Sequence, residues 1–559
     1  MTGVMAVAST AAPAADARLA RLPARRAASG LRLPRLIGLT PLLVAVLNAA
    51  AFVLVRPDVN DLWAARARAS AVNHGVGLTY WFSWFGGGAT PGNYSVVSPY
   101  LCAWIGTELV GALSAVAVTA LVMLLVRDLR HPAAAGAVVC VAAAANLWSG
   151  RVPFLLGSAL AVGALLALRA RRRTPTIALT LLSILASPVA GAFLLLGVSG
   201  TFLTTRTKSW RPIVGYAAGT AAFALIAVAL AFGAPGPEPY SVTLAVQILA
   251  GLALMWVARP PDHLRTTLLV SALAGVALWL VPNGMGSNFA RFVWFCLPVA
   301  VVATSRRRAW VLLLTVAPLV GYGSWQTVVD LRNAARPVSS VDYYKPLATR
   351  LAAIPNLQNY RVEVVNHGAH AGYDALLPYA SLARGWETQA DLSLNKALNL
   401  DPLPPTTYKV WLDNNAVGYV ALPSAMVGGS PEYRLVQAGA PYLHKIWQDA
   451  DWQLFTVRHP TAIVGAPARL VAHSQSTMTI SIPCACRVAV RVRWSKFLDA
   501  ATQPAPERRT STAQPSQATL PPPEPIVAKV SDDGFGWTQL TTTQPGVYTM
   551  SGSISGIVR

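Results

Sequence analysis

Eleven long runs of apolar residues follow one another through residues 36–325, and this repetition constrains the fold more than any other feature. An α-helix needs about 20 apolar residues to cross the roughly 30 Å hydrocarbon core of a bilayer, and most of the runs approach that length. The chain is 54% hydrophobic but only 12% charged, about half the charged fraction of soluble proteins. We therefore predict a polytopic α-helical membrane domain and exclude a disordered chain, a collagen-like fibre and a single-domain cytosolic enzyme. The runs cover residues 36–55, 100–126, 133–149, 153–168, 175–187, 189–204, 212–232, 241–257, 266–281, 290–305 and 309–325.

The charges between these runs predict the orientation of the chain. Lys and Arg number 45 against 23 Asp and Glu, a formal net charge of +22, which on a soluble chain would suggest nucleic-acid binding. Here the excess gathers in short loops and in the N-terminal tail, a positive-inside pattern that favours a multi-pass plasma-membrane protein with no nucleic-acid partner. The N-terminus is predicted to be cytoplasmic, and an odd number of spans places the C-terminal region outside. The basic loops are 127–130, 169–173, 206–211, 259–265 and 306–308.

Composition divides the chain into four parts. Residues 1–35 carry six Arg and no aromatic residue, which predicts a disordered basic cytoplasmic tail. Residues 36–325 form the transmembrane domain. Beyond it, residues 326–460 are predicted to be an extracytoplasmic mixed α/β domain. Residues 461–559, rich in Val, Ile and Thr, are predicted to be an extracytoplasmic β-sandwich with a flexible Pro-rich loop at 500–525.

Two pairs of residues could form a disulfide or contribute to a metal site, and the sequence does not decide either case. Cys484 and Cys486 lie in the predicted outer region, where the environment favours disulfides, yet one intervening residue is a short spacing for such a bond. A zinc site there would need two further ligands. His367 and His370 could contribute to a metal site, but two ligands alone do not define one.

The first outer loop, residues 56–99, contains the strongest candidates for chemistry. Asp58 and Asp61 follow the first span, at the lipid–water boundary where a lipid-phosphate-linked substrate presents its reactive carbon, and either could act as a general base. The alternative is helix capping, with Asp61 opening an interfacial helix over Leu62–Val72. The aromatic residues that follow are either a membrane anchor or part of a substrate site, since Trp and Tyr are common at membrane interfaces. The candidate substrate-binding residues of this loop are His74, Tyr80, Trp84 and Tyr94.

Two ionisable residues fall within predicted spans, where such groups are costly and usually functional. Glu108 could bind substrate or couple transport to protons; the alternative is an interhelical hydrogen bond or a pair with Arg291. Arg291, at the outer mouth of the tenth run, could hold a phosphodiester through paired hydrogen bonds, or extend to lipid headgroups. Asn288, three residues earlier, and Arg151, in a short outer loop, could bind the same phosphate.

A short segment of the outer region concentrates further polar groups. Arg384, Trp386, Glu387 and Asp391 offer an aromatic ring and hydrogen-bonding groups to a saccharide. A buried structural salt bridge is the equal alternative. Trp386 and Glu387 are therefore candidate substrate-binding residues.

This arrangement resembles the GT-C glycosyltransferase superfamily: many spans with the N-terminus inside, acidic residues in a long first outer loop, an interfacial helix and a C-terminal outer domain. Three segments also resemble pieces of actinobacterial membrane proteins of this architecture. The resemblance implies a polyprenyl-phosphate-linked sugar as donor and a catalytic acidic residue at Asp58 or Asp61. An adjacent Asp-Asp or Asp-Glu pair is missing from the first loop, so the identity of the base and the need for a divalent metal both stay open. The three segments are 187–191, 286–291 and 383–391.

Three functions are compatible with these features. The first is inverting transfer of a sugar from a polyprenyl-phosphate donor to a cell-envelope glycan or lipid on the outer face of the membrane, with membrane lipids surrounding the spans. The second is a transporter or flippase of envelope precursors, which predicts a pathway near Glu108. The third is a non-catalytic envelope-assembly scaffold. A transferase should have an outward cavity that holds Asp58 or Asp61 close to Arg291.

Overall fold

A computed structural model describes residues 39–206, 209–233, 236–365, 368–424, 429–502 and 525–554. The predicted disordered tail at 1–35 and most of the predicted flexible loop at 500–525 lie outside these residues, as does His367. The chain divides into two compact units, Met1–Thr40 and Pro41–Arg559. The description that follows concerns the second unit.

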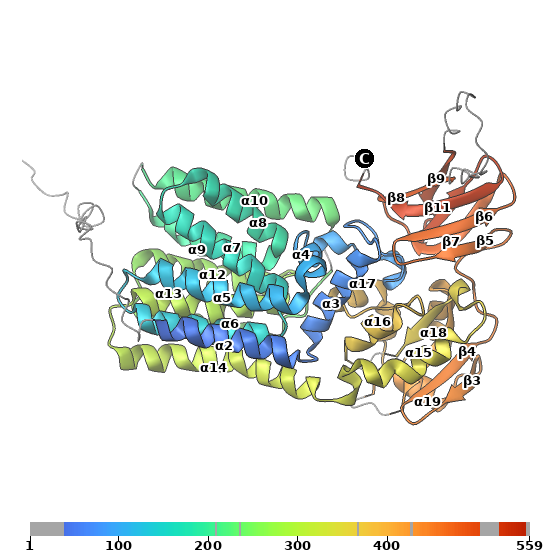
Figure 1. Cartoon of the computed structure of the whole chain (residues 1–559), viewed down its shortest axis with the longest axis horizontal. Helices are drawn as coiled ribbons and strands as arrows, with labels where there is room; N and C mark the ends of the chain where they lie inside the picture. The colour runs from blue at the N-terminus through green and yellow to red at the C-terminus, as the bar shows by residue number, and fades with distance from the viewer. Residues whose placement is uncertain are drawn as a thin grey trace, which may run out of the picture. The chain divides into compact units, whose positions relative to one another are not determined.

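All eleven apolar runs contain helices in the described residues (Figure 1). Six helical segments are long and apolar enough to span a membrane, and α2 is one arm of a helix pair bent by 69° that would make a seventh. Four further apolar helices are shorter. The six are α5 (Thr107–Val126), α7 (Val152–Arg169), α10 (Arg211–Phe232), α12 (Asp262–Leu280), the segment Gly286–Thr304 and α14 (Ala309–Ala334). The others are α2 (Thr40–Val55), α6 (Pro132–Trp148), α8 (Arg173–Ala186), α9 (Pro188–Thr204) and α11 (Val242–Val257).

The predicted run at 100–126 is divided into two helices. Gly106 has a φ of 95°, a conformation that favours glycine, and it separates α4 (Ser98–Ile105) from α5. The Gly286–Thr304 segment is also irregular, since it consists of η4 (Gly286–Phe289), η5 (Phe292–Cys296) and α13 (Leu297–Thr304). Irregular backbone of this kind is tolerated at membrane depth where it is buried in protein or lines a cavity.

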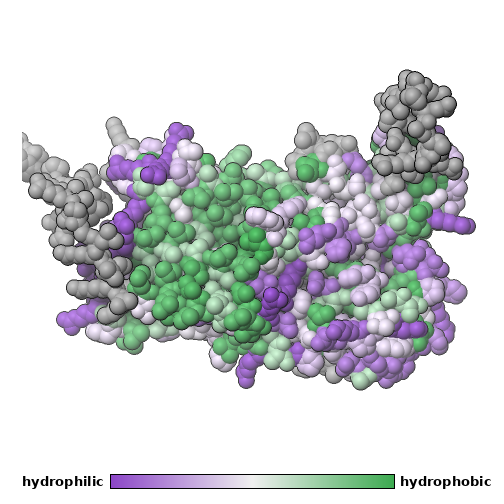
Figure 2. Space-filling model, viewed as in Figure 1, coloured by the Kyte–Doolittle hydropathy of each residue, from purple (hydrophilic) through white to green (hydrophobic). Residues whose placement is uncertain are grey.

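Small residues allow the apolar helices to approach closely. A Cβ at Gly157 of α7 would lie 2.7 Å from the Cβ of Ser187 and 2.8 Å from that of Ala190. A Cβ at Gly200 of α9 would lie 2.2 Å from Oγ1 of Thr267 on α12. Such contacts between backbones are the usual way in which helices associate in lipid. Figure 2 shows hydrophobic residues gathered over the helices, whereas polar residues are more frequent over the rest of the described chain.

The first outer loop contains α3 (Asn60–Asn73), where an interfacial helix was predicted, followed by η2 (Phe85–Gly87) and η3 (Pro91–Asn93). The aromatic residues from Tyr80 to Phe85 are buried in protein. Trp81 and Trp84 stack with ring centroids 4.9 Å apart, and Trp84 lies 3.6 Å from Trp386 of the outer region. The loop is therefore a packing surface for the chain that follows α14.

After α14 the chain forms a mixed α/β region built on a four-stranded sheet in the order β1-β2-β4-β3. The first two strands are parallel and the remaining pairs are antiparallel. The strands are β1 (Arg361–Val364), β2 (Val417–Pro423), β3 (Leu443–Gln448) and β4 (Trp452–Val457). The accompanying helices are α15 (Lys345–Ala352), α16 (Ala371–Leu376), α17 (Thr388–Leu394), α18 (Pro405–Asn414) and α19 (Pro431–Ala438), with short helical turns η6 (Pro337–Ser339), η7 (Val341–Tyr344), η8 (Leu357–Asn359) and η9 (Lys396–Asn399).

The C-terminal region is a β domain whose seven strands are hydrogen-bonded in the order β5-β6-β11-β8-β9-β10-β7. Inward side chains from both halves of this order, such as Ile480 and Val490, share one core. The expected β-sandwich is thus connected as a single sheet. The strands are β5 (Arg469–His473), β6 (Thr477–Ile482), β7 (Arg487–Arg493), β8 (Leu498–Thr502), β9 (Val527–Asp532), β10 (Trp537–Thr541) and β11 (Gly546–Gly552).

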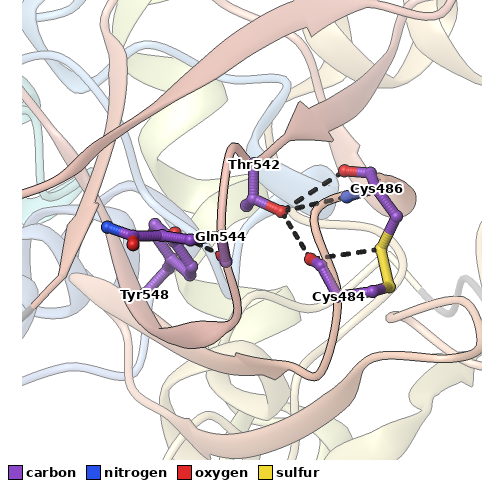
Figure 3. Close-up of a disulfide and its surroundings, with 5 residues drawn as sticks. All are labelled: Cys484, Cys486, Thr542, Gln544 and Tyr548. Carbon is purple, nitrogen blue, oxygen red and sulfur yellow. Dashed lines mark hydrogen bonds between the residues drawn. A yellow bond between two sulfur atoms is a disulfide. The ribbon is translucent and has the colours of Figure 1, made fainter.

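A disulfide joins Cys484 and Cys486 in the turn between β6 and β7 (Figure 3). The Thr542 hydroxyl donates to the Cys484 carbonyl oxygen at 3.0 Å, and its oxygen accepts from the Cys486 amide at 3.4 Å. These bonds tie the turn to the end of β10.

Candidate active site at the junction of two cavities

Two large cavities meet at one cluster of charged residues. The first, the α14 cavity, has a volume of about 470 Å³ and is bounded by α14, η5 and the start of α3. The second, the α10 cavity, has a volume of about 440 Å³ and is bounded by α7, α9, α10 and the segment after Trp386. Five residues line both cavities: Asp61, Arg151, Asn288, Arg291 and His370.

Asp61 lies between two guanidinium groups at this junction. Its Oδ2 is 3.5 Å from Nε of Arg151 and 3.9 Å from an Nη of Arg291. Both ion pairs use Oδ2, so Oδ1 is the oxygen that can accept a proton or hydrogen bond from a ligand. The Asp61 side chain is 42% exposed, whereas that of Arg151 is 9% exposed. The carboxylate is therefore accessible from the cavities while its cationic partner is held within the protein.

Local backbone geometry brings Arg151 to Asp61. Gly150 has a φ of 78°, and a Cβ on it would lie 2.4 Å from the backbone nitrogen of Leu62. Only glycine allows the loop before α7 to approach the first turn of α3 this closely. Arg151 then begins α7, where an Nη also donates to Oδ1 of Asn146 at 3.3 Å.

His370 fixes the start of α3 from the other side. Its backbone amide donates to Oδ1 of Asn60 at 3.1 Å, and its Nδ1 lies 3.0 Å from the Asn60 carbonyl oxygen. Burial lowers the pKa of His370, with the Asp61 carboxylate opposing that shift. A neutral ring that donates from Nδ1 leaves Nε2 as an acceptor. His370 is therefore a positioning residue for Asp61.

The α10 cavity has a polar end and an apolar wall. At the polar end an Nη of Arg68 donates to Oε2 of Glu387 at 3.0 Å, and the guanidinium lies 4.0 Å over the Tyr94 ring. Burial raises the pKa of Tyr94 to about 12, so its hydroxyl is protonated at neutral pH. Trp386 completes this end. The apolar wall consists of Pro153, Phe154, Pro188, Val189, Ala192, Leu225, Val228, Ala229 and Met285.

Glu238 adds a carboxyl group that the sequence did not single out. It lies between α10 and α11, accepts a hydrogen bond from the Ser287 hydroxyl at 2.9 Å and lines the α10 cavity. Burial raises its pKa, and the carboxylates of Asp61 and Glu387 add to the shift. The one available signal was that Glu238 is the acidic residue in the predicted outer loop 233–240.

The α14 cavity is lined by polar groups along one side of α14. Gln326 donates to Oδ1 of Asp330 at 2.9 Å, and Oδ2 of Asp330 lies 3.9 Å from an Nη of Arg151. Asn333 and Tyr322 line the same cavity. This side presents amide, carboxylate and phenol groups to a polar ligand.

Other predicted residues lie away from both cavities. Arg66 binds Glu108 at 2.8 Å and Asp58 at 3.5 Å, so Glu108 pairs with Arg66 in place of Arg291. Burial raises the pKa of Asp58, with Arg66 opposing the shift. His74 ends α3, where its Nδ1 lies 2.8 Å from the Ser70 carbonyl oxygen. Asp58, His74 and Glu108 line neither cavity.

Tyr80 and Trp84 are 2% and 1% exposed and also line neither cavity. The Tyr80 hydroxyl donates to the Arg493 carbonyl oxygen at 2.6 Å, and Trp84 packs on Trp386. Both residues belong to the core between the first outer loop and the outer region. Among the predicted aromatic residues of the loop, Tyr94 is the one that the structure brings to the α10 cavity.

The residues around Trp386 have two different roles. Arg384 forms buried ion pairs with Asp391, Glu363 and Glu432, which is the structural salt bridge that the sequence left open. Burial raises the pKa of Glu363 to about 8, although Arg384 opposes this shift. Trp386 and Glu387, in contrast, line the α10 cavity.

The charged groups at the junction do not fit a divalent metal. Among the described residues, no three His, Cys, Asp or Glu side chains lie close enough together to hold a metal ion. Asp61 is flanked by Arg151 and Arg291, whose charges repel a cation, whereas Mg²⁺ and Ca²⁺ require about six or more oxygen ligands. No step below involves a metal.

Comparisons with known proteins give only weak structural likenesses. No protein-family model and no curated protein matches the chain. Among solved structures, it is similar to the crystal structure of the Archaeoglobus fulgidus oligosaccharyltransferase tethered with an acceptor peptide containing the NVT sequon via a disulfide bond. The TM-score is 0.40 at 11% identity, over 69% of this chain and 69% of that chain. A TM-score this low assigns neither a fold nor an activity.

Proposed function

We propose that this protein is a membrane glycosyltransferase of the GT-C type, which moves a sugar from a polyprenyl-phosphate donor to a cell-envelope glycan or lipid. One observation carries the proposal: a single carboxylate, Asp61, lies where two cavities meet and is flanked by two guanidinium groups. Transfer between two substrates requires a base that both can reach and a cationic site for the leaving phosphate.

The donor occupies the α10 cavity in this proposal. Its apolar wall suits a prenyl chain, since the wall is formed by membrane helices and lacks charged groups along α9 and α10. Its polar end offers Arg291 and Arg151 to the phosphate. Arg68, whose buried Nε has no hydrogen-bond partner among the described residues, adds a third guanidinium at this end of the cavity. The sugar then lies against Trp386 and Glu387.

The acceptor enters from the α14 cavity, where Gln326, Asp330 and Asn333 can bind its hydroxyl groups. Oδ1 of Asp61 takes the proton from the attacking hydroxyl. The hydroxyl oxygen forms a bond to the anomeric carbon, and the bond between that carbon and the phosphate oxygen breaks. The electron pair leaves with the prenyl phosphate, which Arg291 and Arg151 stabilise. Attack from the face opposite to the phosphate inverts the anomeric configuration.

The proposal includes the orientation predicted from the loop charges, with a cytoplasmic N-terminus and an extracytoplasmic C-terminal region. Both cavities then open toward the outer face. A transporter is disfavoured because Glu108, its candidate coupling group, is paired with Arg66 and lines neither cavity.

Transfer assays on carboxylate variants test this function. Membranes containing the full chain are given radiolabelled polyprenyl-phosphate mannose or arabinose, and the label in envelope glycan or lipid is counted. Asp61→Asn should lower transfer by about 10²–10⁴-fold, the usual contribution of a general base. Asp58→Asn is the matched control, since Asp58 contacts Arg66 outside the cavities, and it should retain most activity. Full transfer by Asp61→Asn would refute the assignment.

A variant of the phosphate site separates binding from chemistry. Arg291→Ala should weaken donor binding, measured as a rise in KM for the donor, because it removes a guanidinium from the junction. An unchanged donor affinity would place the phosphate elsewhere.

A further inference from the structure

A third cavity lies in the outer region and shares no lining residue with the other two. It has a volume of about 450 Å³ and separates α18 from the turn between β9 and β10. We refer to it as the α18 cleft. Its volume lies within the range of about 300–1,000 Å³ that is usual for ligand sites.

One wall of the α18 cleft carries an exposed aromatic ring. Phe535 is 86% exposed, so its ring is accessible to a ligand in the cleft. The turn that carries it is fixed by hydrogen bonds. Oδ1 of Asp532 accepts from the amides of Gly534 and Gly536, each at 2.9 Å, and Oδ1 of Asp533 accepts from the amide of Phe535 at 2.8 Å.

The glycines of this turn are required by its backbone. Gly534 and Gly536 have φ values of 90° and 85°, which L-residues rarely adopt. The turn therefore fixes the backbone position of Phe535 at the edge of the cleft.

The opposite wall presents neutral polar groups. Thr406, Val410 and Asn414 are spaced by four residues on α18, so they share one face of that helix. All three are exposed. The side chains of Thr406 and Asn414 have no hydrogen-bond partner among the described residues, which leaves a hydroxyl and an amide available to a ligand.

Among the described residues, Arg493 is the one cation that lines the α18 cleft, and it is engaged in internal contacts. The guanidinium of Arg493 donates to the Phe85 carbonyl oxygen and to Oδ1 of Asn415, each at 3.3 Å, and lies 4.7 Å over the Trp537 ring. On α18, Lys409 pairs with Asp413 and does not line the cleft. The groups that a ligand can reach are therefore neutral.

We propose that the α18 cleft is a binding site for a neutral saccharide, separate from the proposed active site. A sugar ring offers an apolar C–H face to Phe535 and Val410 and hydroxyl groups to Thr406 and Asn414. An anionic ligand would find no free cation among the described residues that line the cleft, and a purely apolar segment would leave the amide and the hydroxyl unpaired.

Binding of neutral oligosaccharides to the full chain in nanodiscs tests this proposal. The probes are mannohexaose, arabinohexaose and maltohexaose, and binding is measured by saturation-transfer NMR and calorimetry. At least one probe should bind with a Kd below about 1 mM. Phe535→Ala should weaken that binding by about tenfold, and Asn414→Ala should weaken it severalfold.

One further variant and the readout define what the result means. Val471→Ala removes an exposed apolar side chain from β5, outside the cleft, and should leave binding unchanged. Because the readout is loss of binding in Phe535→Ala and not transfer, the saccharide site can stand or fall independently of the transferase. The proposal is overturned if no probe binds, if Phe535→Ala binds as the parent chain does, or if sulfated oligosaccharides or peptides bind in preference to the neutral probes.

Discussion

The ion pair between Arg68 and Glu387 joins the first outer loop to the outer region at the α10 cavity. Its removal should increase local unfolding of α3 and α17. Arg68 lies on α3, and Glu387 immediately precedes α17. Their side chains are 5% and 8% exposed and are joined at 3.0 Å. Arg68→Met keeps a chain of similar length but leaves the Glu387 carboxylate buried without its cation.

The size of the effect follows from this burial. Breaking a buried pair by removing one partner costs about 3–5 kcal/mol, because the remaining charge loses its compensation. Glu387→Gln keeps an oxygen for Arg68 but leaves that buried guanidinium without its counter-ion, so the same estimate of about 3–5 kcal/mol applies to it. The double variant Arg68→Met/Glu387→Leu leaves no buried charge from this pair and should recover most of the loss.

Hydrogen exchange measured by mass spectrometry is a suitable assay, since it reports local opening in a multi-domain membrane protein. At 1.4 kcal/mol per tenfold change, Arg68→Met should speed amide exchange in α3 and α17 by about two to three and a half orders of magnitude. The control is Lys409→Met, which breaks an ion pair whose side chains are 25% and 33% exposed and should cost at most about 1 kcal/mol. Equal effects of Arg68→Met and Lys409→Met, or simple additivity in the double variant, would refute the reasoning.

Three other measurements test separate parts of the structure. The pKa of Glu363 is raised from 4.5 to about 8, so the folded state binds the extra proton and stability should fall as pH rises through that window; Glu363→Gln should flatten the dependence of Tm on pH. Gly150→Ala would place a Cβ 2.4 Å from the Leu62 nitrogen and should lower both Tm and transfer, whereas parent-like values would mean that this approach is not needed. In intact cells, an impermeant maleimide should label Lys529→Cys but not Arg306→Cys, and the reverse pattern would overturn the orientation.

The grouping of the candidate residues at the junction could be expected from the sequence, because they flank spans on one predicted side of the membrane. Asp61 follows the first span, Arg151 immediately precedes α7, and Arg291 immediately precedes η5. Loop charge assigns these ends to the same face. Topology alone therefore brings them near one another, although it does not determine contacts.

The choice between Asp58 and Asp61 could not be made from the sequence. Both follow the first span, and the outcome depends on where α3 begins and on which cation each carboxylate meets. Arg66, on the same helix, engages Asp58, whereas Arg151 reaches Asp61 only because Gly150 approaches Leu62. Neither contact has a signature in the local sequence.

The aromatic loop shows a second limit. Tyr80 and Trp84 have the composition of a membrane-interface belt, but the same residue types also form cores. Their burial against Trp386 and Arg493 depends on the fold of regions about 300 to 400 residues later in the chain. Glu238 and His370 reach the site in the same long-range way.

The energetic cost of the junction argues for a function that uses it. Asp61, Arg151 and Arg291 lie near the ends of membrane helices, where charges are costly, and the Arg151 side chain is only 9% exposed. Apolar residues could pack the same helices more stably, so a scaffold gains nothing from this arrangement. A transporter would need the charges along a path through the spans, yet they stand together at the meeting point of two cavities. A reaction that develops negative charge on a leaving phosphate and releases a proton from an acceptor requires both kinds of group at one point.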